Sequence, residues 1–127
     1  MNEGGTSERA FVSIDGEEYV PRRRLEELRA PRQCFLVRQT CGPAWDYSRR
    51  RREQDGWDEH AAFMDALLEE GFVFLGGPTG DPDSGDPLLV VEAADEAAVQ
   101  ARLATDPWMD TVLEIRSIEP WTIWLRR

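Results

Sequence analysis

The order of strand-like and helix-like segments is the feature that most constrains the fold of this chain. Apolar runs typical of strands lie at residues 34–39, 72–77, 88–93 and 112–125. Residues 57–68 instead carry apolar side chains three and four apart, which indicates an amphipathic helix, and residues 94–104 indicate a second helix. The resulting order β-α-β-β-α-β predicts a ferredoxin-like α+β domain with an antiparallel sheet.

The ends of the two helices are marked by their own residues. Gly71 is expected to end the first helix as a left-handed cap, and Pro107 to end the second, because proline disfavours helical geometry before it. In the strand between them, strict alternation would turn Val73 and Leu75 to one face and their neighbours to the other. Both faces of the sheet then need cover. Two helices cover one face, and we expect a second subunit, in a homodimer, to cover the other.

The 127 residues suit one domain preceded by an N-terminal extension. The extension, residues 1–31, contains a possible hairpin around Asp15-Gly16 and a possible short helix after Pro21. Residues 32–127 hold all the segments of the predicted ferredoxin-like domain. The sequence assigns no role to the extension.

The net charge of −10 makes nucleic acid an unfavourable partner, because an acidic surface repels phosphate backbones. No apolar run approaches the roughly 20 residues that cross a bilayer, and the N-terminus does not resemble a signal peptide. We therefore expect cytoplasmic residence and no membrane partner. Cys34 and Cys41 would lie about 23 Å apart in an extended segment, too far for a disulfide.

The topology brings the only histidine, His60, close to Asp106. The connections 40–56, 76–87 and 105–111 meet at one end of the predicted fold, where the first helix begins and the second ends. An imidazole titrates near neutral pH, and a carboxylate on one ring nitrogen would leave the other nitrogen for a substrate. This pair suits isomerisation, elimination or proton abstraction beside a carbonyl. The alternatives are a structural histidine in the apolar stripe and a simple Asp-Pro turn.

The same three connections supply the expected substrate pocket, which consists of Trp45, Arg52, Gly77, Pro78 and Trp108. The arginine run at 49–52 is either a solvated start of a helix or an anion-holding site at the mouth of this pocket. No metal site is expected, because the chain lacks a Cys/His cluster and its Asp-rich turn does not match an EF-hand. No cofactor is expected either, since no loop has the strand–loop–helix setting of a phosphate cradle.

Residues 33–126 resemble the YCII-related family of dimeric α+β barrel proteins. The resemblance rests on H-x-x-F-x-x-x-L at His60–Leu67, G-F-V-x-x-G-G-P at Gly71–Pro78, D-P-W from Asp106 and E-P-W from Glu119. It implies that His60 and Asp106 form a proton-transferring pair. Most members have no established substrate, and a few are described as acting on chlorinated aromatic breakdown products.

The sequence thus favours a small cofactor-independent enzyme, a lyase or an isomerase, in which His60 is the acid and base and Asp106 orients it. The alternative is a non-catalytic dimeric module that binds a small molecule or a protein through the same cleft. A ligand-sized cavity lined by His60 would favour the enzyme, whereas a filled cleft with His60 sealed in the core would favour the module.

Overall fold

The computed structural model describes residues 11–14, 18–21 and 32–127. In the N-terminal part, β1 (Phe11–Ile14) and β2 (Glu18–Pro21) pair as an antiparallel two-stranded sheet. The turn at Asp15-Gly16 and the short helix expected after Pro21 lie outside the described residues. The chain divides into two compact units, of which the larger is Gln33–Trp121.

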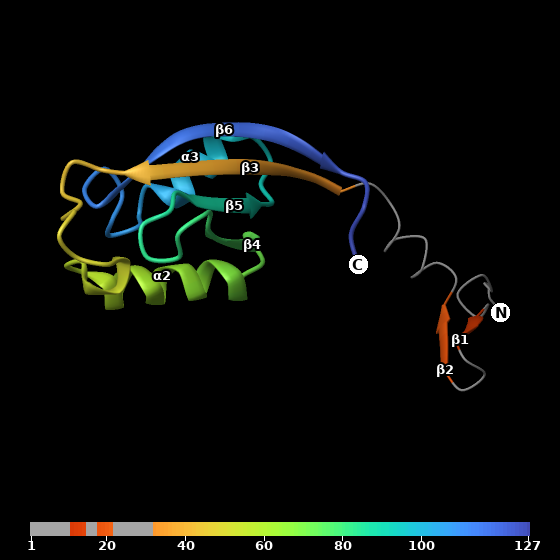
Figure 1. Cartoon of the computed structure of the whole chain (residues 1–127). Coiled ribbons are helices and arrows are strands. Elements are labelled where there is room, and N and C mark those ends of the chain that lie inside the picture. Colours follow the sequence, from red (N-terminus) through yellow and green to blue (C-terminus); the bar gives the residue numbers. More distant parts are fainter. Residues whose placement is uncertain (1–10, 15–17, 22–31) are drawn as a thin grey trace. The chain divides into compact units, whose positions relative to one another are not determined.

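The larger unit is built on a four-stranded antiparallel sheet in the order β4-β5-β3-β6 (Figure 1). Its elements along the chain are β3 (Arg32–Cys41), the 3-10 helix η2 (Arg51–Glu53), α2 (Trp57–Glu69), β4 (Val73–Pro78), β5 (Pro87–Val91), α3 (Glu96–Leu103) and β6 (Leu113–Ile123). This order, with the first strand in the interior beside the third, is the ferredoxin-like topology. The α+β fold predicted from the sequence is therefore confirmed.

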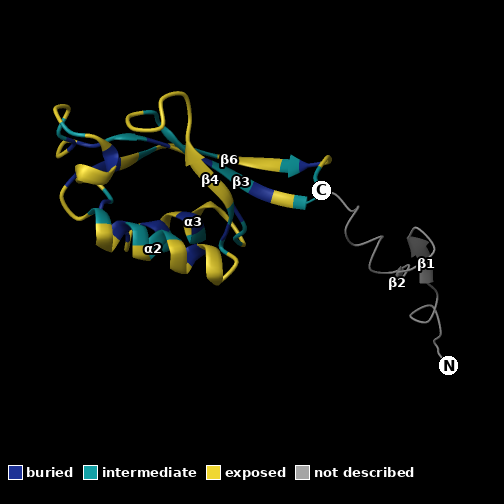
Figure 2. Cartoon of the chain, turned by 60° about the horizontal axis from the view of Figure 1, so that its bottom comes forward, coloured by how far each residue is buried: buried dark blue, intermediate teal, exposed yellow. Residues whose placement is uncertain are grey.

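Both helices lie on the same side of the sheet (Figure 2). A buried apolar core fills the space between them and the strands, with Leu67 from α2, Val99 and Leu103 from α3, and Val37, Val73, Leu89 and Val91 from the sheet. The removal of these side chains from water is the main force that holds the helices to the sheet.

The end of α2 has the geometry expected of a glycine cap. Gly71 has φ of 83°, and its N–H donates to the Leu68 carbonyl at 3.1 Å. The N–H of Phe72 donates to the Leu67 carbonyl at 3.0 Å. These two bonds are the Schellman motif, and they satisfy carbonyl groups that the helix itself leaves without partners.

The predicted alternation in β4 is wrong after its first residue. Val73 pairs with Val91, but Leu75 pairs with Val90, so one extra residue, Phe74, is inserted as a bulge. A bulge reverses the faces of the residues beyond it. Val73 therefore packs in the core, whereas Leu75 lies on the opposite face and is 55% exposed.

Two further features concern the cysteines and the helices. Cys34 and Cys41 do not form a disulfide bond. Within the described ranges, no helix is at once long enough and apolar enough to span a lipid bilayer.

Candidate active site

His60 and Asp106 form a buried pair. The Nδ1 atom of His60 lies 2.9 Å and 3.0 Å from the two carboxylate oxygens of Asp106. The backbone N–H of Trp108 also donates to Oδ1 of Asp106, at 2.9 Å. An ionised carboxylate can only accept hydrogen bonds, so in its contact with His60 the donor is the ring N–H at Nδ1. In the neutral ring, Nε2 then carries the lone pair.

Two tryptophans hold the imidazole in place. The ring of Trp108 stacks on that of His60, with centroids 4.1 Å apart and planes 8° from parallel. Trp57 packs against His60 at 5.9 Å in a tilted arrangement. The side chain of Asp106 is wholly buried behind the ring, and that of His60 keeps 10% exposure. The ring is thus held from two sides, and only a small part of it meets solvent.

The start of α2 is shaped to fit beside Trp108. Gly56 is the N-cap residue and has φ of 78°, in the left-handed region. A Cβ at this position would lie 3.2 Å from Nε1 of Trp108. That indole nitrogen donates to the Asp55 carbonyl at 2.8 Å, so the residue before the cap also fixes the tryptophan. The backbone at 55–56 therefore sets the position of the ring against which His60 packs.

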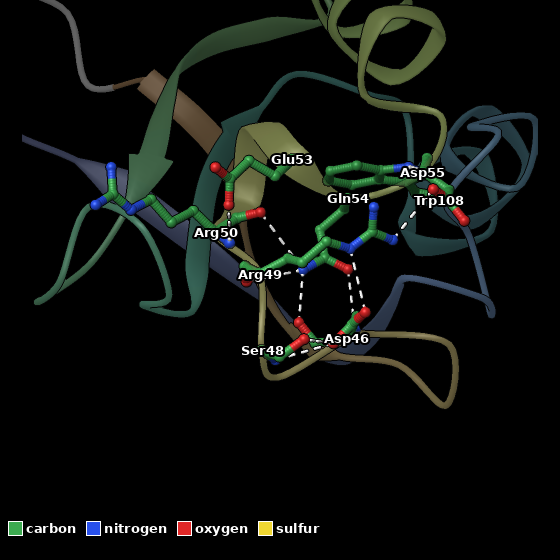
Figure 3. Close-up of polar contacts among 8 residues, drawn as sticks. All are labelled: Asp46, Ser48, Arg49, Arg50, Glu53, Gln54, Asp55 and Trp108. Atoms are coloured by element: carbon green, nitrogen blue, oxygen red, sulfur yellow. Dashed lines mark hydrogen bonds and ion pairs between the residues drawn. The ribbon is translucent and has the colours of Figure 1, made fainter.

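The loop before α2 is tied together by one buried glutamine (Figure 3). Oε1 of Gln54 accepts from the Asp46 N–H at 2.9 Å, while its Nε2 donates to the carbonyls of Asp46 at 2.8 Å and Arg49 at 3.0 Å. Arg49 adds ion pairs to Asp46 and Asp55, each at 3.1 Å. These bonds hold together the polar loop 42–56, which leads into α2.

A pocket of about 250 Å³ opens beside His60. Its floor comes from the sheet and its wall from α2, and its lining is mostly apolar. The lining residues are Gln39, Arg51, Trp57, His60, Met64, Asp65, Leu68, Val73, Gly76, Gly77, Pro78, Pro87, Leu89 and Leu113. Since Nδ1 of His60 is held by Asp106, Nε2 is the ring nitrogen available to a molecule in this pocket.

Of the five residues expected to bind substrate, two line the pocket and three do not. Gly77 and Pro78 line the pocket, as does His60. Trp45 is buried in a separate cluster with Trp108, and neither tryptophan is among the lining residues. Arg52 lies outside the lining as well, with its guanidinium 5.7 Å from the centre of the Trp57 ring.

Two buried polar lining residues were not named individually from the sequence, although Arg51 belongs to the arginine run at 49–52 that was considered as an anion-holding site. Arg51 is only 9% exposed, and Gln39 only 2%. Gln39 follows Phe35 and Val37 at alternate positions, so it occupies the face of β3 that packs on the helices. A polar residue on an apolar strand face is the signal by which it could have been found. No comparable signal distinguishes Arg51 from its arginine neighbours.

The fold and the site together define the class of protein: an α+β ferredoxin-like domain with a His-Asp pair beside a small apolar pocket. The family model of the YCII-related domain matches residues 39–122, which is more than half of the chain. The protein therefore belongs to the YCII-related family. Searches of curated proteins and of solved structures found no match.

Proposed function

We propose that the protein is a small cofactor-independent enzyme, of the lyase or isomerase type, that moves a proton on a small organic molecule. The observation that carries the proposal is the His60–Asp106 pair with its contact of 2.9 Å, on the wall of a pocket large enough for a ligand. The pocket is smaller than the roughly 300–1,000 Å³ of sites for drug-sized molecules, which favours a small substrate.

In the proposed reaction, Nε2 of His60 accepts a proton from a carbon beside a carbonyl group. The electron pair of the broken C–H bond stays in the substrate as an enolate. In an isomerisation, the imidazolium returns the same proton to a different carbon. In an elimination, the electron pair forms a C=C bond and a leaving group departs with the electrons of its own bond. Asp106 holds Nδ1–H throughout and so keeps Nε2 as the base.

The test is solvent exchange at carbon, which does not require the natural substrate. Small ketones and 2-oxo acids are incubated in D₂O, and deuterium uptake is followed by NMR. We expect the wild type to accelerate uptake in at least one compound, and His60→Gln to lose an acceleration of roughly 10²–10⁴-fold. Equal rates in both proteins would contradict the proposal.

One observation favours the alternative, a non-catalytic binding module: His60 is only 8% exposed. Such a module would bind small molecules in the pocket without promoting exchange in any of them. The exchange assay therefore separates the two functions directly.

We also propose that the protein is a cytoplasmic homodimer. Leu36, Val90 and Leu75 are register partners on three adjacent strands, so they share the sheet face opposite the core. A second copy would cover this face and remove the exposed Leu75 from water. Cys34 and Cys41, which do not form a disulfide bond, suit a reducing compartment.

A further inference from the structure

Arg51 is a buried cation in the wall of the pocket. The residue is only 9% exposed, and burial lowers the pKa of its guanidinium. The carboxylates of Asp83 and Asp86 act on it only from a distance, because no carboxylate oxygen of the described residues forms an ion pair with it. Buried charges in proteins are ordinarily paired, so this arginine calls for a counter-charge.

The guanidinium also has hydrogen-bonding capacity left over. Nη2 donates to the Gly85 carbonyl, and the ring of Trp45 lies 5.3 Å from Cζ. The Nε atom, however, is buried and has no partner among residues 32–127. A guanidinium that keeps a donor unused suits a planar oxyanion.

Gln39 provides a second donor in the same pocket. Its side chain lies on the inner face of β3, and its buried Nε2 lacks a hydrogen-bond partner within the described part of the chain. A buried amide donor without a partner costs free energy that a bound acceptor would recover. Arg51, Gln39 and His60 all line one pocket, and its remaining surface is largely apolar.

We propose that the ligand of this pocket is a small organic carboxylate with an apolar body, whose carboxylate is bound by Arg51 and Gln39. Asp65, an exposed residue, is the one acidic lining side chain. It lies five residues beyond His60, about 7–8 Å farther along α2. Because Asp65 would repel a carboxylate, the charged end of the ligand lies at the end of the pocket nearer His60. This inference rests on the proposed function for the role of His60, and it names the substrate class: carboxylic acids with a proton to move near the carboxylate.

The probes are benzoate and its uncharged isostere benzamide, titrated into the full-length protein. Binding is followed by NMR through the His60 ring protons and the Trp57 indole N–H, because both residues line the pocket. Benzoate should shift both signals and bind at least about tenfold more tightly than benzamide. Acetate should bind more weakly than benzoate, since it has no apolar body.

The neighbouring arginine provides a matched control. Arg51→Met should weaken benzoate binding at least about tenfold, whereas Arg52→Met should leave it unchanged, because Arg52 does not line the pocket. Arg51→Lys keeps the charge without Nε and should lose part of the affinity. Gln39→Leu keeps the buried volume and should also weaken benzoate. Equal binding of benzoate and benzamide, no binding of benzoate, or full affinity in Arg51→Met would overturn the inference.

The result is separable from that of the exchange assay. Benzoate binding needs no catalysis, and in His60→Gln it can still be followed through Trp57. Binding that depends on Arg51 without exchange in any compound would leave the carboxylate site standing and remove the enzyme. Exchange in the wild type together with equal binding of benzoate and benzamide would support the enzyme and remove the carboxylate site.

Discussion

The contact between Gly56 and Trp108 couples the start of α2 to the candidate site, and Gly56→Ala tests it. A non-glycine residue at φ of 78° costs roughly 1–2 kcal/mol in backbone strain. The added Cβ also lies 3.2 Å from Nε1 of Trp108, so the indole must move by a few tenths of an ångström. Such overpacking typically costs about 1–3 kcal/mol. We therefore expect a total loss of about 2–5 kcal/mol in the free energy of unfolding.

Gly80→Ala is the matched control for the strain. Gly80 also has positive φ, 70°, but an added Cβ there would meet nothing within 4 Å. It should lose only the strain of roughly 1–2 kcal/mol. The difference between the two variants, measured by urea unfolding, isolates the contact with Trp108.

A second measurement shows whether the contact reaches the site. The ring of Trp108 stacks on that of His60 at 4.1 Å, so a displaced indole changes the ring current at the imidazole. The His60 ring protons should shift in Gly56→Ala and stay in place in Gly80→Ala. Equal destabilisation of the two variants, or unmoved His60 signals in Gly56→Ala, would refute the coupling.

Three further predictions concern separate features. In Asp106→Asn, the amide can present its NH₂ group as a donor to Nδ1 of His60. We therefore expect ¹⁵N NMR of this single histidine to show more of the Nε2–H tautomer. An unchanged tautomer ratio would argue against the carboxylate as the orienting group. Leu75→Glu should turn the proposed dimer into a monomer in light scattering, because it places a charge on the exposed sheet face. The hydrogen bonds from Arg102 lower the pKa of Glu70. The pair therefore stabilises the fold at pH values above the ordinary carboxyl pKa, and this stabilisation is lost as the pH falls through the lowered pKa of Glu70. Arg102→Gln should raise that pKa in ¹³C NMR and destabilise the protein at neutral pH but not at pH values below the lowered pKa.

The sequence was sufficient for the fold because each helix and strand has a local physical cause. The stripe of apolar residues in α2 and the glycine after it set the length of that helix, and Gly71 takes up the left-handed geometry expected. The meeting of His60 with Asp106 followed from chain direction alone. In contrast, the bulge at Phe74 depends on pairing with β5, and the apolar run in β4 gives no sign of it. Tertiary contacts decided the face on which Leu75 lies.

The pocket was less accessible to sequence reasoning, because it depends on how one short segment is oriented. In the arginine run, Arg49 pairs with two aspartates, while Arg51 and Arg52 occupy successive positions of η2. A 3-10 helix has about three residues per turn, so neighbouring side chains point roughly 120° apart. Only one of the two can therefore enter the pocket, and the identical side chains do not reveal which. The N–H of Arg51 donates to the Asp83 carbonyl at 3.1 Å and its Nη2 to the Gly85 carbonyl, and the hydrogen bonds of Gln54 hold the backbone of the same loop together. A loosened loop, as in Gln54→Ala, should for that reason weaken benzoate binding while leaving every lining residue of the pocket in the chain.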